Sequence, residues 1–304
     1  MITLNTEKGL VRIESWDDIL TRPGFTSDVD PRAVKLHAII GNYLFKTFIT
    51  CGLSTCHQPH GSGYLVVTKD GRETNIGKDC GKTHFSVDFV QMRRTFDRDV
   101  LAQERRERLW SLKNRLPSIK SEIDTLKSET YGANWVYTMT SKLLGTSRGL
   151  PLVIVDHLRK LIRTGSGELT IERAATQQEI EIADASGQRR SGPLYFTDRV
   201  GFIEGFSALL AENSLRSLLI DSVEPAIKAL DSAEIDLLGS KELSALSRLT
   251  KDLDNSADRL KQLVLTGRRL LVKQNISQLS RFAISSQDKR SFADFLNSFP
   301  SSPD

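Results

Sequence analysis

The hydrophobic positions of this chain follow different patterns in different regions. An apolar run at 63–68 and a second segment at 72–76 flank Lys69-Asp70-Gly71, whose turn chemistry predicts a β-hairpin. From Phe85 onward, apolar residues recur every three or four positions, which predicts a helical region over 85–130. We therefore expect a small hairpin followed by a long helix.

The first fifty residues predict a mixture of short elements, which we interpret as an N-terminal cap over 1–50. Residues 10–13 are predicted to form a strand, and Ser15 is a suitable N-cap for a short helix over 16–20. After Asp30 and Pro31, the apolar positions follow helical spacing, so a helix through residue 40 is expected. Its apolar face would pack on the module that follows.

Residues 96–130 are predicted to form a basic helical arm. Its apolar residues recur at heptad spacing, at Leu109, Leu112, Leu116, Ile119, Ile123 and Leu126. Pro117 interrupts the stripe, and we expect a kink there because proline removes a backbone N–H and clashes with the preceding turn. The stripe is either buried against the chain's own helices or forms a coiled coil for self-association.

The remainder of the chain alternates helical and mixed segments. Residues 131–200 are predicted as a small α+β unit with helices over 135–144 and 151–163, a turn at 145–149 and strands at 168–172 and 179–182. This order resembles a winged helix, although a plain α+β unit explains it equally well. Residues 201–284 are predicted as a helical bundle and 285–304 as a tail, of which 301–304 should fray. The fold class is therefore mainly α with small β parts (α+β).

Composition and charge narrow the class of protein. The chain has 304 residues, 39% hydrophobic and 26% charged, with a net charge of +4, which is typical of a globular protein and permits contact with an acidic polymer. It contains no apolar run of membrane-spanning length and no recognisable signal peptide, so we predict a cytoplasmic protein without a membrane partner.

The cysteines carry the clearest chemical signal. All three, Cys51, Cys56 and Cys80, lie within one short window together with His57, His60 and His84. The spacing C-x4-C followed by C-x3-H supplies the ligands of a structural Cys3His zinc site, with Cys80 and His84 one turn apart on a predicted helix. His57 and His60 are alternatives to His84 as the fourth ligand.

A metal-binding knuckle, a hairpin and a ligand-bearing helix start, in that order, resemble the treble-clef group of zinc folds over residues 48–95. We assign the zinc module to 51–95. Gly52 and Gly81, which follow the first and third cysteines, would let backbone N–H groups approach the thiolates. The module is predicted to be structural, because the signatures of zinc deaminases and of H-E-x-x-H metalloproteases are absent.

The distribution of basic residues indicates the class of molecule that the chain binds. Between 91 and 120 they far outnumber the acidic ones, and arginine matches phosphate geometry. We predict a zinc-binding, non-catalytic nucleic-acid-binding protein that contacts phosphates through Lys78, Lys82, Arg93, Arg94 and Arg98 of the module and its basic helix. One alternative is an adaptor or assembly subunit that binds proteins through its helices. Another is a metal-dependent nuclease that uses His57 or His60, with Asn75.

Overall fold

The computed structural model describes residues 1–6, 9–145, 150–186 and 192–301, which divide into two compact units. Unit 1 contains Met1–Asn114 and Ala233–Arg248, and unit 2 contains Arg115–Ser232 and Leu249–Asp304. With 57% of the residues in helices and 20% in strands, the predicted fold class, mainly α with small β parts, is confirmed.

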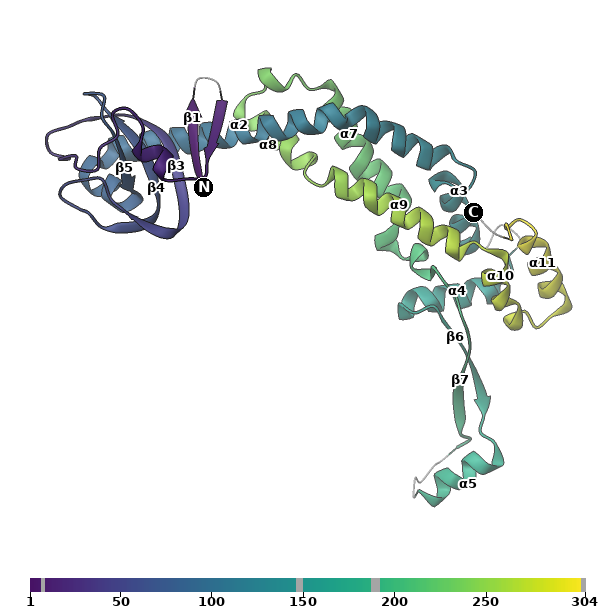
Figure 1. Cartoon of the computed structure of the whole chain (residues 1–304). Coiled ribbons are helices and arrows are strands. Elements are labelled where there is room, and N and C mark those ends of the chain that lie inside the picture. Colours follow the sequence, from purple (N-terminus) through teal and green to yellow (C-terminus); the bar gives the residue numbers. More distant parts are fainter. Residues whose placement is uncertain (7–8, 146–149, 187–191, 302–304) are drawn as a thin grey trace. The chain divides into compact units, whose positions relative to one another are not determined.

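Unit 1 is organised around an antiparallel sheet of five strands in the order β2-β1-β3-β4-β5 (Figure 1). Its strands are β1 (Ile2–Thr6), β2 (Gly9–Ile13), β3 (Leu36–Thr50), β4 (Pro59–Thr68) and β5 (Glu73–Gly77). A short helix, α1 (Asp17–Leu20), separates β2 from β3. The helix was predicted there, but its N-cap is Trp16 and not Ser15, whose Oγ accepts from the Asp17 N–H at 3.1 Å. The strands predicted as a cap and those of the zinc module thus share one sheet.

The predicted hairpin is present with its turn. Tyr64 pairs with Ile76 and Val67 with Glu73, which joins β4 to β5. Gly71 has a φ of 85° in the connection, a conformation that glycine adopts without steric cost. The hairpin returns the chain to the end of the sheet at which the cysteines lie.

The helix predicted after Pro31 is wrong, because residues 36–50 form the long strand β3. β3 pairs with β1 on one side and with β4 on the other, and these long-range hydrogen bonds override the local helical spacing of Leu36, Ile39 and Ile40. The β-branched and aromatic residues of 39–50 suit a pleated strand.

Helix α2 (Lys78–Ser128) begins directly after β5 and covers one side of the sheet. Its residues Phe89, Phe96 and Val100 are buried in one core cluster with residues of β3, β4 and β5. Its backbone departs from helical geometry at Ser86, where φ is 48° and ψ is −124°. Pro117 lies inside the continuous part of α2, so no new helix starts at the proline.

The heptad stripe of α2 is buried within the chain itself. Leu109 and Leu112 in unit 1, and Leu116, Ile119 and Ile123 in unit 2, are at most 7% exposed. In unit 1 the chain returns as a 3-10 turn (Ile235–Leu237) and α8 (Ser240–Leu249), both of which lie along α2. The stripe is therefore core, the first of the two interpretations.

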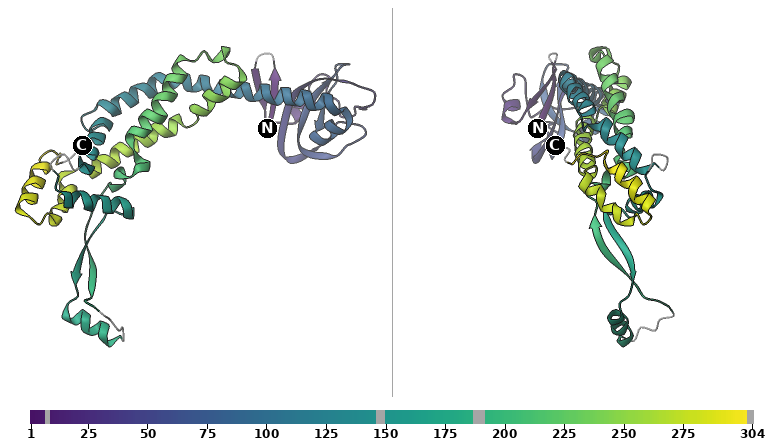
Figure 2. Two further views of the ribbon diagram at one scale, coloured as in Figure 1. Left: turned by 180° about the vertical axis from the view of Figure 1, so that it is seen from behind. Right: turned by 90° about the vertical axis from the view of Figure 1, so that its right-hand side faces the viewer.

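Unit 2 is helical apart from one two-stranded sheet (Figure 2). Its elements, besides the end of α2, are α3 (Ala133–Leu144), α4 (Leu152–Thr164), β6 (Glu168–Ala174), α5 (Gln177–Ala185), β7 (Tyr195–Phe202), α6 (Leu215–Ser217), a π-helix (Leu218–Val223), α7 (Glu224–Ser232), α9 (Leu253–Leu270), α10 (Lys273–Ser277) and α11 (Ser286–Leu296), with 3-10 turns at Phe206–Leu209, Ala211–Asn213 and Gln278–Phe282. The predicted helices over 135–144 and 151–163 correspond to α3 and α4.

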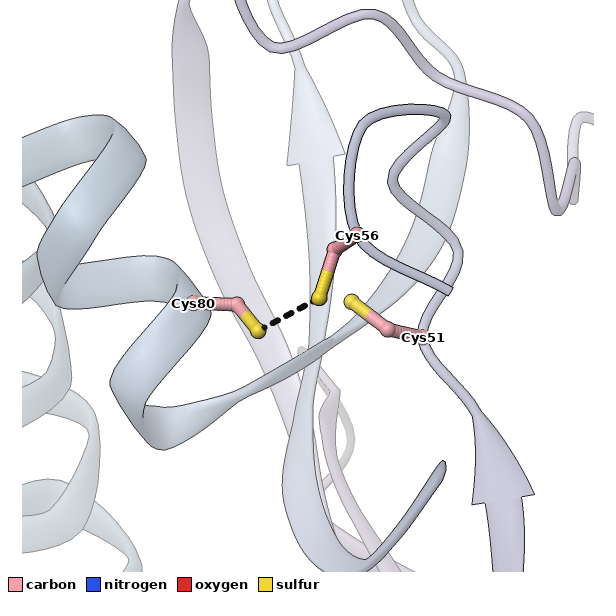
Figure 3. Close-up of side chains that lie close together, drawn as sticks. All are labelled: Cys51, Cys56 and Cys80. Carbon is pink, nitrogen blue, oxygen red and sulfur yellow. Dashed lines mark hydrogen bonds between the residues drawn. The ribbon is translucent and has the colours of Figure 1, made fainter. Parts of the chain in front are cut away.

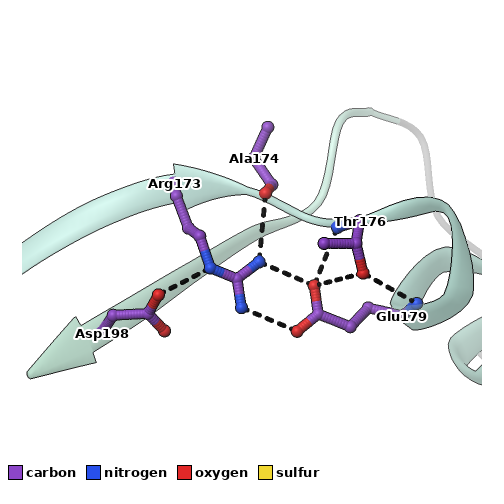
Figure 4. Close-up of polar contacts among 5 residues, drawn as sticks. All are labelled: Arg173, Ala174, Thr176, Glu179 and Asp198. Atoms are coloured by element: carbon purple, nitrogen blue, oxygen red, sulfur yellow. Dashed lines mark hydrogen bonds and ion pairs between the residues drawn. The ribbon is translucent and has the colours of Figure 1, made fainter.

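One predicted strand of unit 2 is wrong, and the error follows from a helix cap. Residues 179–182 form part of α5 and not a strand, because Thr176 and Glu179 make a reciprocal capping box (Figure 4). The partner of β6 is β7 instead. The predicted tail contains α11, which Ser285 caps through its side chain. Of the turn predicted at 145–149, residues 146–149 lie outside the described ranges.

The structure offers no candidate membrane span: none of the described helices combines the length and the hydropathy that crossing a bilayer requires.

Candidate metal centre

Three separate elements bring the cysteines of unit 1 together. Cys51 follows the last residue of β3, Cys56 lies in the loop before β4, and Cys80 lies in the first turn of α2. Their sulfur atoms lie within 4.8 Å of one another and point toward a common centre (Figure 3). All three are free thiols. This cluster is a site that could bind a metal ion.

The loop that carries Cys51 and Cys56 is closed by its own backbone. The Cys51 N–H donates to Gln58 O at 3.1 Å, and the Cys56 N–H donates to Leu53 O at 3.0 Å. His57 adopts a left-handed conformation, with a φ of 50°, directly after the second cysteine. The tight turn orients both sulfurs to the same side.

Backbone N–H groups also point at the sulfurs. Leu53 and Gly77 donate to Cys51 Sγ, and Gln58 donates to Cys56 Sγ, which favours the thiolate forms that bind metals. The N–H of Gly52 itself donates to Asn75 O at 2.9 Å. Glycine is required at this position because a Cβ would collide with the Thr74 hydroxyl.

The three thiols cannot all ionise without a cation. Burial, followed by the interactions with Cys56 and Cys51, raises the pKa of Cys80 to about 12. Burial is also the main reason that the pKa of Cys51 is raised. Burial acts in the same direction on Cys56, but hydrogen bonds from Cys80, Gln58 and Cys51 outweigh it and lower the pKa. A divalent cation would remove the repulsion between the thiolates and lower all three values.

The donor set fits a zinc ion. Zinc takes thiolate ligands at about 2.3 Å in tetrahedral geometry, so sulfur atoms around it are about 3.8 Å apart. The Cys56 and Cys80 sulfurs are 3.0 Å apart, so binding would require a displacement of only about 1 Å. Cys51 is fully buried, whereas Cys56 and Cys80 are partly exposed, so the remaining position of the tetrahedron faces the solvent side.

None of the three candidate histidines belongs to the described cluster. His84 is exposed on the same turn of α2 as Cys80, four residues later. His57 is also exposed, and its Nε2 atom lies 3.9 Å from an Asp28 carboxylate oxygen. His60 has both ring nitrogens in hydrogen bonds, Nδ1 with Gln58 O at 3.0 Å and Nε2 with the Tyr43 hydroxyl at 2.5 Å. Of the three histidines, His84 is the one that shares a helix with a cysteine of the cluster, one turn after Cys80.

A polar network beside the cysteines was not predicted as a unit. The Tyr43 hydroxyl lies between His60 and Asn75, whose side-chain amide also donates to Thr50 O at 2.8 Å. Burial raises the pKa of Tyr43, so the hydroxyl stays neutral. The network ties β3, β4 and β5 together. Tyr43 and His60 are seventeen positions apart, and no local sequence signal joins them.

The predicted phosphate-contacting residues have different surroundings. Lys78, Lys82 and Arg94 are exposed. Arg98 pairs with Asp99 at 2.9 Å. Arg93 lies beside the Tyr64 hydroxyl, which donates to Asp97 at 3.1 Å, and the Arg93 Nε atom is buried without a hydrogen-bond partner among the described residues.

Lys82 and Arg94 line the same open cavity of about 360 Å³, which Ser86, Val87, Val90 and Gln91 complete. The cavity lies on α2 around its kink at Ser86. No hydrogen bond or ion pair of the Lys82 or Arg94 side chain occurs among the described residues. We call it the cationic cavity.

Most other basic residues of the predicted arm contact the chain itself. In unit 1, Arg106 donates to Leu238 O, Arg108 to Ser247 O and Lys113 to Ala233 O. In unit 2, Arg115 pairs with Asp254 and Lys120 with Asp231. The positive charge of the arm therefore serves mainly to fix the returning helices.

No protein-family model, curated protein or solved structure matches this chain.

Proposed function

We propose that unit 1 is a zinc module in which Cys51, Cys56, Cys80 and His84 hold one structural Zn²⁺. The free energy of zinc binding would stabilise the junction between the sheet and α2, at which the core is interrupted by three partly polar side chains. The order of ligand-bearing loop, hairpin and helix supports a treble-clef-like architecture. The ion would have no catalytic role, since both ring nitrogens of His60 already have partners.

We further propose that unit 1 binds nucleic acid at the cationic cavity. The observation that carries this proposal is that Lys82 and Arg94, alone among the predicted contacts, line one cavity together. Lys82 is also only two residues from Cys80, so metal binding would fix the position of its backbone. Two convergent cations without internal acidic partners are suited to a backbone phosphate.

The experiment is to measure affinity for labelled DNA and RNA, single-stranded and duplex, as a function of salt. Lys82→Glu/Arg94→Glu should weaken binding at low salt by at least about tenfold and reduce the slope of log K against log salt by about one for each cation removed. Lys46→Glu/Lys69→Glu, the same charge change at exposed sites elsewhere in unit 1, is the matched control. Equal binding by the two double variants would refute the proposal.

A second candidate, an adaptor function, is favoured by the β6–β7 hairpin of unit 2. The hairpin extends from the helices of that unit and carries α5, none of whose residues is buried (Figures 1 and 2). Ile182 and Tyr195 are 70% and 60% exposed. Exposed apolar side chains on an isolated hairpin are suited to a protein partner.

The adaptor function has its own test. A protein that co-purifies with the wild-type chain should be released by Ile182→Glu/Tyr195→Glu and retained by Lys82→Glu/Arg94→Glu. The opposite pattern would argue against the hairpin as the docking element.

A further inference from the structure

A second cavity of unit 1 adjoins the cationic cavity. It has a volume of about 350 Å³ and lies between α2 and the strands β1 and β3. Gln91 lines both cavities, and Thr95 of the second cavity follows Arg94 of the first in sequence. The two cavities are therefore neighbours on α2, and a ligand with two chemically different parts that extends past Gln91 would contact both.

The lining of the second cavity differs from that of the first. Four of its side chains, Asn5, His37, Gln91 and Thr95, are exposed and polar, and no hydrogen bond or ion pair of these side chains occurs among the described residues. Apolar surface is provided by Met92 and Phe96. Convergent polar groups on an apolar wall, in a space of this size, are typical of a small-molecule or nucleobase site.

The charge of this second cavity argues against a phosphate. Its acidic member, Asp99, is already neutralised by Arg98, whose Nε atom donates to it at 3.0 Å. No lysine or arginine lines the cavity. An uncharged, flat group with hydrogen-bonding edges fits this lining, whereas an anion fits the neighbouring one.

We infer that the second cavity binds an unstacked nucleobase whose adjoining phosphate is held by Lys82 and Arg94, and this inference rests on the nucleic-acid function proposed above. The amide groups of Asn5 and Gln91 each present one donor and one acceptor, the combination that reads base edges bidentately. Met92, which is half-buried, supplies apolar surface for the base.

The inference specifies the class of nucleic acid. A base within a duplex is stacked and paired, so it cannot enter a cavity beside a helix, whereas the bases of a single strand are free to do so. The preferred ligand is therefore single-stranded DNA or RNA, and the identity of the base matters at one position.

The experiment uses the full-length, metal-loaded chain and four short homopolymer strands, together with a strand of the same length whose sugars carry no bases. Wild-type protein should bind the best homopolymer about tenfold more tightly than the base-free strand. Asn5→Ala should remove most of that difference without changing the affinity for the base-free strand, because Asn5 lines the second cavity and not the cationic cavity. His37→Ala, on a different strand, should have the same effect, and Gln177→Ala in unit 2 should have none.

The possible results separate the two proposals. Wild-type affinity that is equal for base-free and normal strands overturns the base site while leaving phosphate binding intact. A loss of affinity for the base-free strand in Asn5→Ala also overturns it, because that residue would then act on the phosphate. Absence of binding to every strand at low salt, the base-free one included, refutes the nucleic-acid function itself and the base site with it.

Discussion

The Sγ atoms of Cys56 and Cys80 lie 3.0 Å apart, although 24 positions separate the two residues in the sequence. The β4–β5 hairpin closes this distance by bringing the start of α2 back to the loop that follows β3. The cluster is therefore a direct consequence of the hairpin, and a metal bound there would in turn hold the hairpin's two ends together.

Replacement of Cys80 by serine should abolish metal binding and destabilise unit 1. In small modules a structural zinc contributes on the order of 10 kcal/mol, so the part of the chain over 50–95 should lose its cooperative unfolding transition. Elemental analysis and thermal unfolding provide the measurements. Thr83→Ser, on the same turn of α2, serves as the control and should keep one zinc per chain. An unchanged melting profile in Cys80→Ser would exclude a structural metal.

The fourth ligand can be identified by cobalt substitution. We expect His84→Ala to lower metal affinity by at least about tenfold and to change the visible spectrum of the Co²⁺ form, because one nitrogen ligand is lost. His57→Ala and His60→Ala should leave the spectrum unchanged. If either of these variants reproduces the loss and His84→Ala does not, our assignment is wrong.

Gly52→Ala should destabilise unit 1 by roughly 1–3 kcal/mol, because the added methyl group would overlap the Thr74 hydroxyl in a close-packed region. Denaturant unfolding measures the change. The matched control is Gly239→Ala in the same unit, at which the nearest atom would be 3.5 Å from the new Cβ. Similar losses in both variants would show that the close approach to Thr74 has no special cost.

The stability that the capping box gives to the start of α5 should depend on pH. Hydrogen bonds from Arg173, followed by those from Thr176, lower the pKa of Glu179 to about 2. Because the unfolded value is about 4.3, the contribution of Glu179 to local stability is fully present above that pH and is lost as the pH falls toward 2. Amide exchange in α5, followed during acid titration, should show this loss.

The matched control for that titration is a neighbouring glutamate of the same helix. Glu179→Gln should weaken protection of α5 at neutral pH and flatten its acid dependence, whereas Glu181→Gln should keep the wild-type profile. Figure 4 shows why: Glu179 contacts both Arg173 and Thr176. A wild-type profile in Glu179→Gln would mean that the cap does not hold the helix.

The cysteine cluster could be predicted from the sequence better than its surroundings. The turn residues Asp70 and Gly71 act locally, so the hairpin and the return of Cys80 toward Cys56 could be inferred. Strand β3 could not be inferred from the sequence, because its pairing with β1 and β4 depends on distant residues. The α5 cap could have been predicted, since the Thr176-x-x-Glu179 pattern is present in the sequence. The alternating isoleucines suggested a strand instead.

Two features of α2 could not be predicted, for a different reason. They are the position of its kink and the partners of its basic side chains. Nothing in the sequence around Ser86 specifies a positive φ. Pro117, whose residue type disfavours a helix interior, is nevertheless accommodated in the helix. The basic residues of the arm could not be divided in advance into those with and without internal partners. Ser247 and Ala233, which accept from Arg108 and Lys113, are 139 and 120 positions away.

The discontinuity of unit 1 has a consequence for synthesis on the ribosome. The segment Ala233–Arg248 completes a unit that otherwise ends at Asn114, so all of the first part of unit 2 emerges before unit 1 can close. Until then Arg106, Arg108 and Trp110 lack the partners that this segment supplies. Expression of the N-terminal part alone would leave that face of α2 uncovered, and a stable fragment should be made by joining the two segments through a short linker.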